Sequence, residues 1–184
     1  MTYAEYLAAE ADAASKHEYL GGAVRAMAGG TPEHGAISAA VITLLTNALQ
    51  GKPCRVFTSD VRLRVQATDL STYPDVSVVC GRLERAPEDE NAIINPVLLV
   101  EVLSDSTEAY DRGEKSAHYR RIPSLREYLL ISQREPRLEL FRRGDNDRWE
   151  LHEAGSGESL ELASVEAFLE TDDVYRDPLA PSNQ

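Results

Sequence analysis

Three observations predict a single α/β (α+β) domain with a central β-sheet. The chain has 184 residues, 42% of them hydrophobic, which is enough for one core and gives no reason to infer a second. Residues 31–51 carry apolar side chains at helical spacing, whereas residues 96–104, PVLLVEVLS, are apolar on both faces of a strand. A strand of that kind is covered on each side. We therefore expect packed layers on both faces of the sheet.

Capping and turn residues predict the elements at the start of the chain. Thr2 and Glu5 form a capping-box pattern, which predicts a short helix that ends before Lys16. Residues 17–27, HEYLGGAVRAM, then predict two short strands around a Gly-Gly turn.

The longest predicted helix follows this hairpin. Thr31 is a favourable N-cap, Pro32 suits the first helical position, and the apolar spacing continues to Gly51. Residues 54–65, CRVFTSDVRLRV, alternate apolar and polar side chains and predict a strand with one face outward and a bend near Ser59.

The second half of the chain predicts more strands and one helix. YPDVSVVC, residues 73–80, and PVLLVEVLS are two strands separated by a polar loop. Asp111 and Glu114 form a second capping-box pattern, which predicts a helix towards Arg121. A meander of three strands follows at residues 126–132, 137–143 and 148–153.

The net charge of −12 is unevenly distributed. Residues 145–184 hold eleven of the 31 acidic residues but two of the 19 basic ones, which leaves residues 1–144 at −3. We expect a domain core at about residues 16–150 and an acidic extension at about 155–184 that forms a solvated, partly helical surface. Basic residues cluster nearer the middle of the chain, so a nucleic-acid partner is compatible with the composition, although such clusters are also common on solvated surfaces.

The lack of a membrane-spanning or signal segment and the lack of a cysteine framework predict the location of the protein and the state of its cysteines. Residues 36–49 form the longest apolar-leaning run, which is too short for a membrane span, and the amino terminus lacks a basic start followed by an apolar stretch. These features predict a cytoplasmic protein with no membrane partner. Cys54, Cys80 and the four histidines lack the spacing of a disulfide framework or zinc site, so we expect both cysteines to be core or half-buried residues.

One glutamate, Glu101, interrupts the apolar strand. Alternation puts it on the face of Leu99 and Leu103, where an unpaired carboxylate would be costly. We expect it to be neutralised, paired or bound to a cation. Asp75, in a neighbouring strand, is a candidate companion, and two adjacent carboxylates favour a divalent ion such as Mg²⁺. The alternatives are an arginine partner or an exposed strand end for Glu101, and a turn-capping role for Asp75.

A lysine can complete this group. On the helix predicted from Asp111, Lys115, Tyr119 and Ile122 share one face, and the helix directly follows the strand of Glu101. Lys115 can thus point back at the carboxylates, although a solvated lysine is the alternative. Two acids and a lysine around a divalent ion are a recurrent arrangement for cutting phosphodiesters.

Several motifs in order resemble the Uma-two family, a group described as endonucleases within the PD-(D/E)XK nuclease superfamily. The resemblance extends from about Tyr3 to Trp149 and implies a restriction-endonuclease-like core, with a mixed central β-sheet flanked by helices. It also implies cleavage of nucleic acid, expected to be DNA, with Mg²⁺ or Mn²⁺ as cofactor. The motifs are GGAVRAMAGGTPEHGAIS, YPDVSVVC, LLVEVLSDST, DRGEKSAHYRRIPSLREYLLI and LFRR.

The resemblance also assigns roles to residues. Asp75 falls on the aspartate of the family's PD motif and Glu101 on the acidic residue of its (D/E)XK motif. The superfamily pattern has lysine two positions later, where this sequence has Leu103. Lys115 fits the lysine that the Uma-two pattern carries on the following helix. We expect Asp75, Glu101 and the Val102 carbonyl to hold the metal and Lys115 to orient water. Because double-strand cleavage requires two sites, a homodimer is also compatible with this function.

Other residues are candidates for accessory roles. Glu33 and His34 open the longest helix and could approach the metal, phosphate or attacking water, although a helix N-terminus favours glutamate by itself and His34 could be an ordinary surface residue. Tyr119 could contact the scissile phosphate or simply pack the helix. Asp60 and Arg62 are candidates for the rim of the cleft.

Two other functions are compatible with the sequence. The first is a catalytically inactive nuclease-fold module for binding or oligomerisation, which Leu103 and the acidic extension favour. The second is a hydrolase with two carboxylates and no metal, which requires one of them to stay protonated at neutral pH.

Overall fold

A six-stranded mixed β-sheet forms the centre of the molecule. In this computed structural model, which describes residues 1–27 and 29–177, the strand order is β12-β11-β10-β9-β6-β3. β9 and β10 pair in parallel, and the other neighbours pair antiparallel. The strands are β3 (Cys54–Thr58), β6 (Val76–Cys80), β9 (Leu98–Leu103), β10 (Glu127–Ser132), β11 (Arg137–Arg143) and β12 (Trp149–Gly155). The predicted meander is therefore confirmed, and β9 is a central strand.

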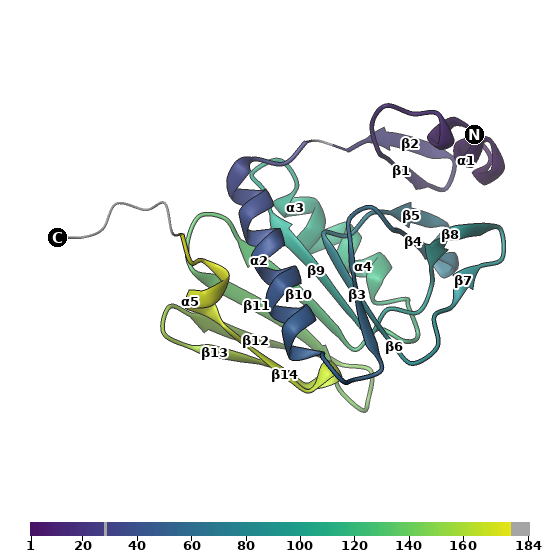
Figure 1. Cartoon of the computed structure of the whole chain (residues 1–184). Helices are drawn as coiled ribbons and strands as arrows, with labels where there is room; N and C mark the ends of the chain where they lie inside the picture. The colour runs from purple at the N-terminus through teal and green to yellow at the C-terminus, as the bar shows by residue number, and fades with distance from the viewer. Residues whose placement is uncertain (28, 178–184) are drawn as a thin grey trace.

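The long helix α2 (Pro32–Ala48) lies across one face of this sheet (Figure 1). Thr31 is its N-cap and accepts a hydrogen bond from the His34 N–H, as the sequence predicts. Its buried side chains, Ile37, Val41 and Leu45, belong to one core cluster with the side chains of β9 that face the helix. Leu98, Val100 and Val102 supply that face of β9.

A helical segment and a second sheet cover the other face. The segment comprises α3 (Glu108–Tyr110), the π-helical turn η2 (Asp111–Lys115) and α4 (Ser116–Tyr119). The second sheet has the order β2-β1-β5-β4-β8-β7. Its strands are β1 (His17–Leu20), β2 (Ala23–Ala26), β4 (Arg62–Val65), β5 (Leu70–Thr72), β7 (Arg85–Ala86) and β8 (Asp89–Ile93), with the 3-10 turn η1 (Gln66–Thr68) between β4 and β5. Both faces of β9 are thus covered.

The predicted capping box at Asp111 and Glu114 is wrong. The helical segment begins earlier, at Glu108, and the Asp111 N–H donates to the Thr107 carbonyl. Asp111 is buried inside the segment rather than exposed at its start. The pattern misleads because an aspartate followed three residues later by a glutamate has the spacing of a capping box even where the aspartate side chain does not cap the backbone.

The amino-terminal elements follow the predictions. Helix α1 (Tyr3–Ala11) has the capping box of Thr2 and Glu5, and β1 and β2 form the hairpin around the two glycines. The bend near Ser59 is larger than expected, because β3 and β4 on either side of it belong to different sheets. Figure 1 shows this N-terminal part beside β5, at the end of the molecule away from β12.

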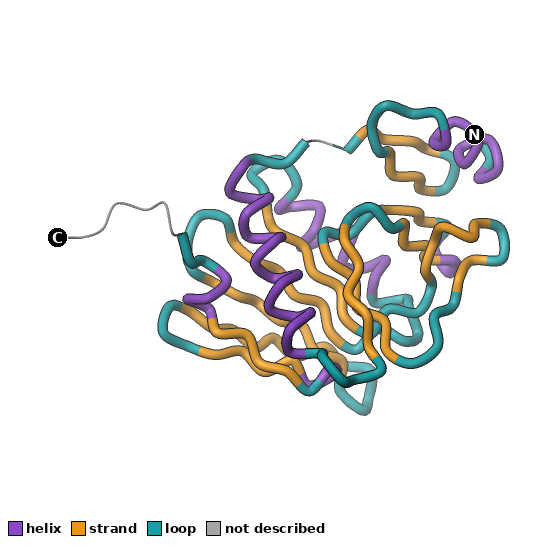
Figure 2. Tube along the Cα trace, in the orientation of Figure 1, coloured by secondary structure: helices purple, strands orange, loops and turns teal. Residues whose placement is uncertain are grey.

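The acidic segment that begins at about residue 155 is a hairpin packed on the core, which corrects the expectation of a solvated surface, whereas its partly helical character is as expected. It comprises β13 (Ser159–Leu162), the 3-10 turn η3 (Ala163–Val165), β14 (Ala167–Glu170) and the short helix α5 (Thr171–Val174) (Figure 2). Leu160, Leu162 and Leu169 are buried in the cluster that includes α2. Acidic and apolar residues alternate here, so the charges lie outside while the leucines face the core.

Cys54 and Cys80 form a disulfide, which corrects the expectation of two unpaired cysteines. They lie directly opposite each other in the antiparallel register of β3 and β6, with their Cα atoms 4.0 Å apart. Their separation of 26 residues carries no pairing signal by itself. The pairing depends on a strand register that the sequence does not reveal.

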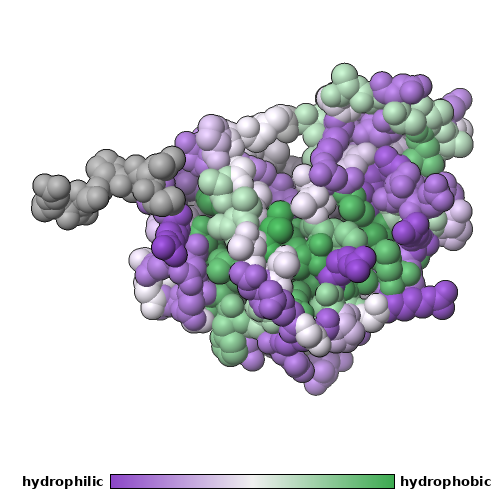
Figure 3. Space-filling view, viewed as in Figure 1, coloured by the Kyte–Doolittle hydropathy of each residue, from purple (hydrophilic) through white to green (hydrophobic). Residues whose placement is uncertain are grey.

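Among the described residues, no helix is long and apolar enough to cross a membrane. Figure 3 shows hydrophilic residues over much of the face that carries α2, with hydrophobic residues gathered towards its centre.

Candidate active site

Asp75 and Glu101 lie side by side where β6 meets β9. Val76 pairs with Val100 in the antiparallel register of these strands. Asp75, which precedes Val76, therefore lies next to Glu101, which follows Val100. The expected adjacency of the two strands is confirmed. Pro74 precedes Asp75 and cannot donate a ladder hydrogen bond, which fits the start of β6 at Val76.

Asp75 is anchored by a backbone amide and approached by a histidine. Its Oδ2 accepts a hydrogen bond of 2.7 Å from the Val102 N–H and lies 3.2 Å from Nε2 of His34, at the first turn of α2. The hydrogen bond to Asp75 raises the pKa of His34, against the opposing effect of burial. His34 is therefore brought to the site by the helix N-terminus, as a partner of the carboxylate.

Glu101 is 4% exposed and points to the face opposite α2. Its Oε1 accepts a hydrogen bond of 2.6 Å from the Tyr119 hydroxyl and lies 2.9 Å from Nζ of Lys115. Burial raises the pKa of Glu101 to about 8; Lys115 and Tyr119 lower it, whereas Asp75 and Asp111 raise it further. Burial thus favours the neutral form of this carboxyl group, and the Lys115 charge opposes burial.

Lys115 is held by three carboxylates. Its Nζ lies 2.9 Å from Glu101, 3.3 Å from Asp111 Oδ1 and 3.5 Å from Glu18 Oε1. The lysine is 4% exposed. Burial lowers its pKa, but the negative charges of Glu101, Asp111 and Glu18 outweigh burial and raise the pKa above the ordinary value. The ammonium group therefore stays charged and aimed at Glu101.

Two members of this cluster were not identified from the sequence. Glu18 lies on β1 and reads as an alternating polar residue of a short strand, so only its contact with Lys115 reveals it. Asp111 was assigned as a cap, although its spacing of four from Lys115 on a helix was a usable signal. Burial raises the pKa of Asp111, and its buried Oδ1 has Lys115 nearby but no hydrogen bond of good geometry.

The structure separates other candidates from these contacts. Glu33 is exposed at the first turn of α2, where hydrogen bonds to backbone and to Thr31 lower its pKa. Asp60 pairs with Lys16 at 2.7 Å, and Arg62 forms a two-pronged pair with Asp89. Asp60 lies in the turn between β3 and β4 and Arg62 at the start of β4, and neither takes part in the Lys115 contacts.

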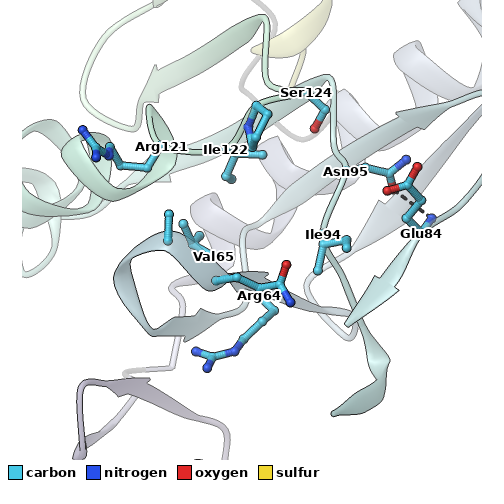
Figure 4. A pocket seen from close by; sticks show the side chains of 11 residues that line it. Arg64, Val65, Glu84, Ile94, Asn95, Arg121, Ile122 and Ser124 are labelled. Carbon is cyan, nitrogen blue, oxygen red and sulfur yellow. Dashed lines mark hydrogen bonds between the residues drawn. The ribbon is translucent and has the colours of Figure 1, made fainter. Parts of the chain in front are cut away.

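A cavity of about 390 Å³ lies elsewhere in the molecule and contains none of the residues just described. Figure 4 shows Ile122 and Ser124 on one side of it, Val65 and Ile94 on the other, and the guanidinium of Arg64 pointing away. Arg64 instead binds Asp69 and Glu88. A hollow without convergent reactive groups is a weaker candidate than the buried acids and lysine, so the group around Glu101 is the candidate active site.

One family model matches most of the chain. A family model named Uma2 and described as "Putative restriction endonuclease" matches residues 3–172. Two relatives from Synechocystis sp. (strain PCC 6803) are described as uncharacterized proteins. The first, slr1290, is 39% identical over 94% of this chain and 90% of its own length; the second, sll1609, is 34% identical over 88% and 91%.

A solved structure has the same fold. It is described as the crystal structure of "a putative nuclease belonging to DUF820 from Anabaena variabilis" and superimposes with a TM-score of 0.76. It covers 95% of this chain and 98% of its own, at 18% identity. The mixed central sheet flanked by helices that the sequence predicts is confirmed, and this likeness shows that the fold is shared with that protein.

Proposed function

The chain belongs to the Uma2 family of restriction-endonuclease-like proteins, and on that premise we propose that it is a nuclease that hydrolyses phosphodiester bonds of nucleic acid, with DNA as substrate and Mg²⁺ or Mn²⁺ as cofactor. The observation that carries the proposal is the buried Glu101, which lies beside Asp75 and is paired with Lys115. A carboxylate in such a place is tolerated when a ligand or a reaction requires it.

The residues present fit a divalent cation. Three acids, Glu18, Glu101 and Asp111, surround the ammonium of Lys115, and Asp75 with its partner His34 lies beside Glu101, so negative charge is in excess. In residues 1–27 and 29–177, no three His, Cys, Asp or Glu side chains are arranged to hold a metal. Mg²⁺ does not need three, because it is commonly bound by one or two carboxylates together with water and substrate phosphate.

Asp75, Glu101 and the Val102 carbonyl would hold this cation. Both described contacts of Glu101 are made to Oε1, which leaves Oε2 for a ligand. The Val102 N–H points at Asp75, and since N–H and C=O of a strand residue point to the same side, the carbonyl of Val102 faces this edge too. When bound, the cation would polarise the phosphoryl oxygen and lower the pKa of the attacking water.

The remaining side chains orient the reacting groups. Lys115, kept charged by its carboxylates, can hold the water or offset the negative charge that develops on the phosphate. The Tyr119 hydroxyl fixes Oε1 of Glu101, and His34 fixes Oδ2 of Asp75. Glu33 is not needed in this arrangement.

Cleavage assays test the proposal. Purified protein is incubated with supercoiled plasmid, single-stranded DNA and RNA, in Mg²⁺, Mn²⁺ or EDTA. We expect cleavage of DNA that depends on metal and falls by at least about 100-fold in Asp75→Asn, Glu101→Gln and Lys115→Met. Preferential cleavage of RNA would correct the assigned substrate.

A control variant separates chemistry from stability. Glu127 is also a fully buried glutamate, but it binds Arg142, Ala163 and Ser164, so Glu127→Gln should lower stability and leave cleavage intact below its melting temperature. Cleavage that persists in Asp75→Asn and Glu101→Gln would refute the assigned residues. If the wild type does not cleave and calorimetry detects no Mn²⁺ binding, the chain is the inactive binding module instead.

A further inference from the structure

The N-terminal hairpin reaches into the candidate active site through one residue. Glu18 lies on β1, which pairs with β5 of the second sheet. The Thr72 hydroxyl on β5 donates a hydrogen bond to Glu18 Oε1, the oxygen that lies 3.5 Å from Nζ of Lys115. The side chain of Glu18 is 13% exposed. The carboxylate of Glu18 is therefore held between the Thr72 hydroxyl and the Lys115 ammonium.

The three carboxylates around Lys115 come from three parts of the fold. Glu101 belongs to β9, Asp111 to the π-helical turn that carries the lysine itself, and Glu18 to the hairpin. The ammonium lies within 3.5 Å of all three carboxylates and has three hydrogens to direct among them. Removing the charge of Glu18 takes away one of the three attractions that orient the ammonium and frees the side chain to turn about its flexible stem.

The other contacts of this N-terminal region do not involve the lysine. Glu10, on α1, accepts hydrogen bonds from the His17 N–H and the Tyr73 hydroxyl, and its Oε2 lies 2.9 Å from His17 Nδ1. The Tyr6 hydroxyl donates to the His17 carbonyl. These bonds attach α1 to the second sheet independently of Glu18, so the loss of the Glu18 carboxylate should leave the hairpin in place.

We propose that Glu18 is a positioning residue for the nuclease reaction, which orients the Lys115 ammonium towards Glu101 and makes the N-terminal hairpin part of the catalytic apparatus. This inference rests on the proposed function. Glu18 does not touch the reacting atoms; it acts through the lysine.

Kinetics of three single variants test the inference. Glu18→Gln keeps the volume and removes the charge, and we expect kcat to fall about 10- to 100-fold with KM, Mn²⁺ affinity and melting temperature close to wild type. Glu18→Asp keeps the charge and should retain part of the activity. Glu10→Gln is the matched control, because it also neutralises a buried glutamate of the same region, and its kcat should be unchanged.

A double variant shows whether Glu18 acts through the lysine. Lys115→Arg keeps a positive charge in a different shape, so the loss caused by Glu18→Gln should be smaller in that background than in the wild type. Losses that multiply independently would overturn the inference, as would equal losses in Glu10→Gln and Glu18→Gln. Wild-type kcat in Glu18→Gln would overturn it alone and leave the nuclease intact, whereas a wild type that does not cleave would overturn both.

Discussion

The protonation of Glu101 makes the stability of the protein depend on pH. Burial raises its pKa from 4.5 to about 8, so the folded protein binds this proton more tightly than the unfolded chain does. The stabilisation that follows is fully present below pH 4.5 and is lost as pH rises towards 8. His34 acts with the same sign, because its pKa is raised as well.

We therefore predict that the metal-free protein is less stable at pH 8 than at pH 5.5. Urea unfolding in EDTA should show a difference of several kcal/mol, since one pKa unit corresponds to about 1.4 kcal/mol. Glu101→Gln should remove a large part of that difference and leave the part due to His34 and Asp111, whose pKa values are also raised. Equal stability of the wild type at the two pH values would contradict the raised pKa of Glu101.

A glycine next to the site controls the position of His34. A Cβ atom added at Gly30 would lie 3.0 Å from Nδ1 and 3.2 Å from Cγ of the His34 ring, so the ring must move, and with it the contact to Asp75. We predict that Gly30→Ala lowers cleavage several-fold with little change in melting temperature. Gly29→Ala is the control, because its Cβ meets nothing within 4 Å. Equal activity of the two variants would show that the His34 position does not matter.

At the scale of elements, the C-terminal hairpin is part of the core. Leu169 on β14 is 1% exposed, whereas Phe168 beside it is 64% exposed. We predict that Leu169→Ala lowers the free energy of unfolding by about 2–5 kcal/mol, while Phe168→Ala changes it by less than about 0.5 kcal/mol. Urea titration measures both. A small effect of Leu169→Ala would mean that the hairpin is loosely attached after all.

Elements with a local cause could be predicted, and contacts between distant elements could not. The capping box of α1, the N-cap of α2 and the acid within the apolar β9 are each encoded within a few residues, and the structure has all three. The pairing of Cys54 with Cys80 depends on strand register, and the contact of Glu18 with Lys115 depends on how two sheets pack. Asp111 was misassigned because its spacing from Glu114 is the same whether the aspartate caps a helix or is buried inside one.

At the scale of the whole molecule, charge is distributed on both sides of the main sheet. The acidic hairpin packs with α2 on one face, and Glu101 points to the opposite face with Tyr119 and Lys115. The hairpin therefore packs on the face of the sheet opposite Tyr119 and Lys115. The carboxylates of the site repel a phosphate backbone more directly than the hairpin does, in a protein of net charge −12.

This balance predicts that binding of nucleic acid depends on the divalent cation. Lys115→Met removes the lysine but keeps Asp75 and Glu101, so it should bind labelled DNA in Mg²⁺ without cutting it, and binding should weaken at least about 10-fold in EDTA. Recruitment through the cation at the carboxylates neutralises few phosphates with Lys and Arg, so affinity should then fall less steeply with salt than for a strongly basic DNA-binding protein. Fluorescence anisotropy measures both effects, and tight binding in EDTA would mean that a basic surface, rather than the carboxylate site, recruits the substrate.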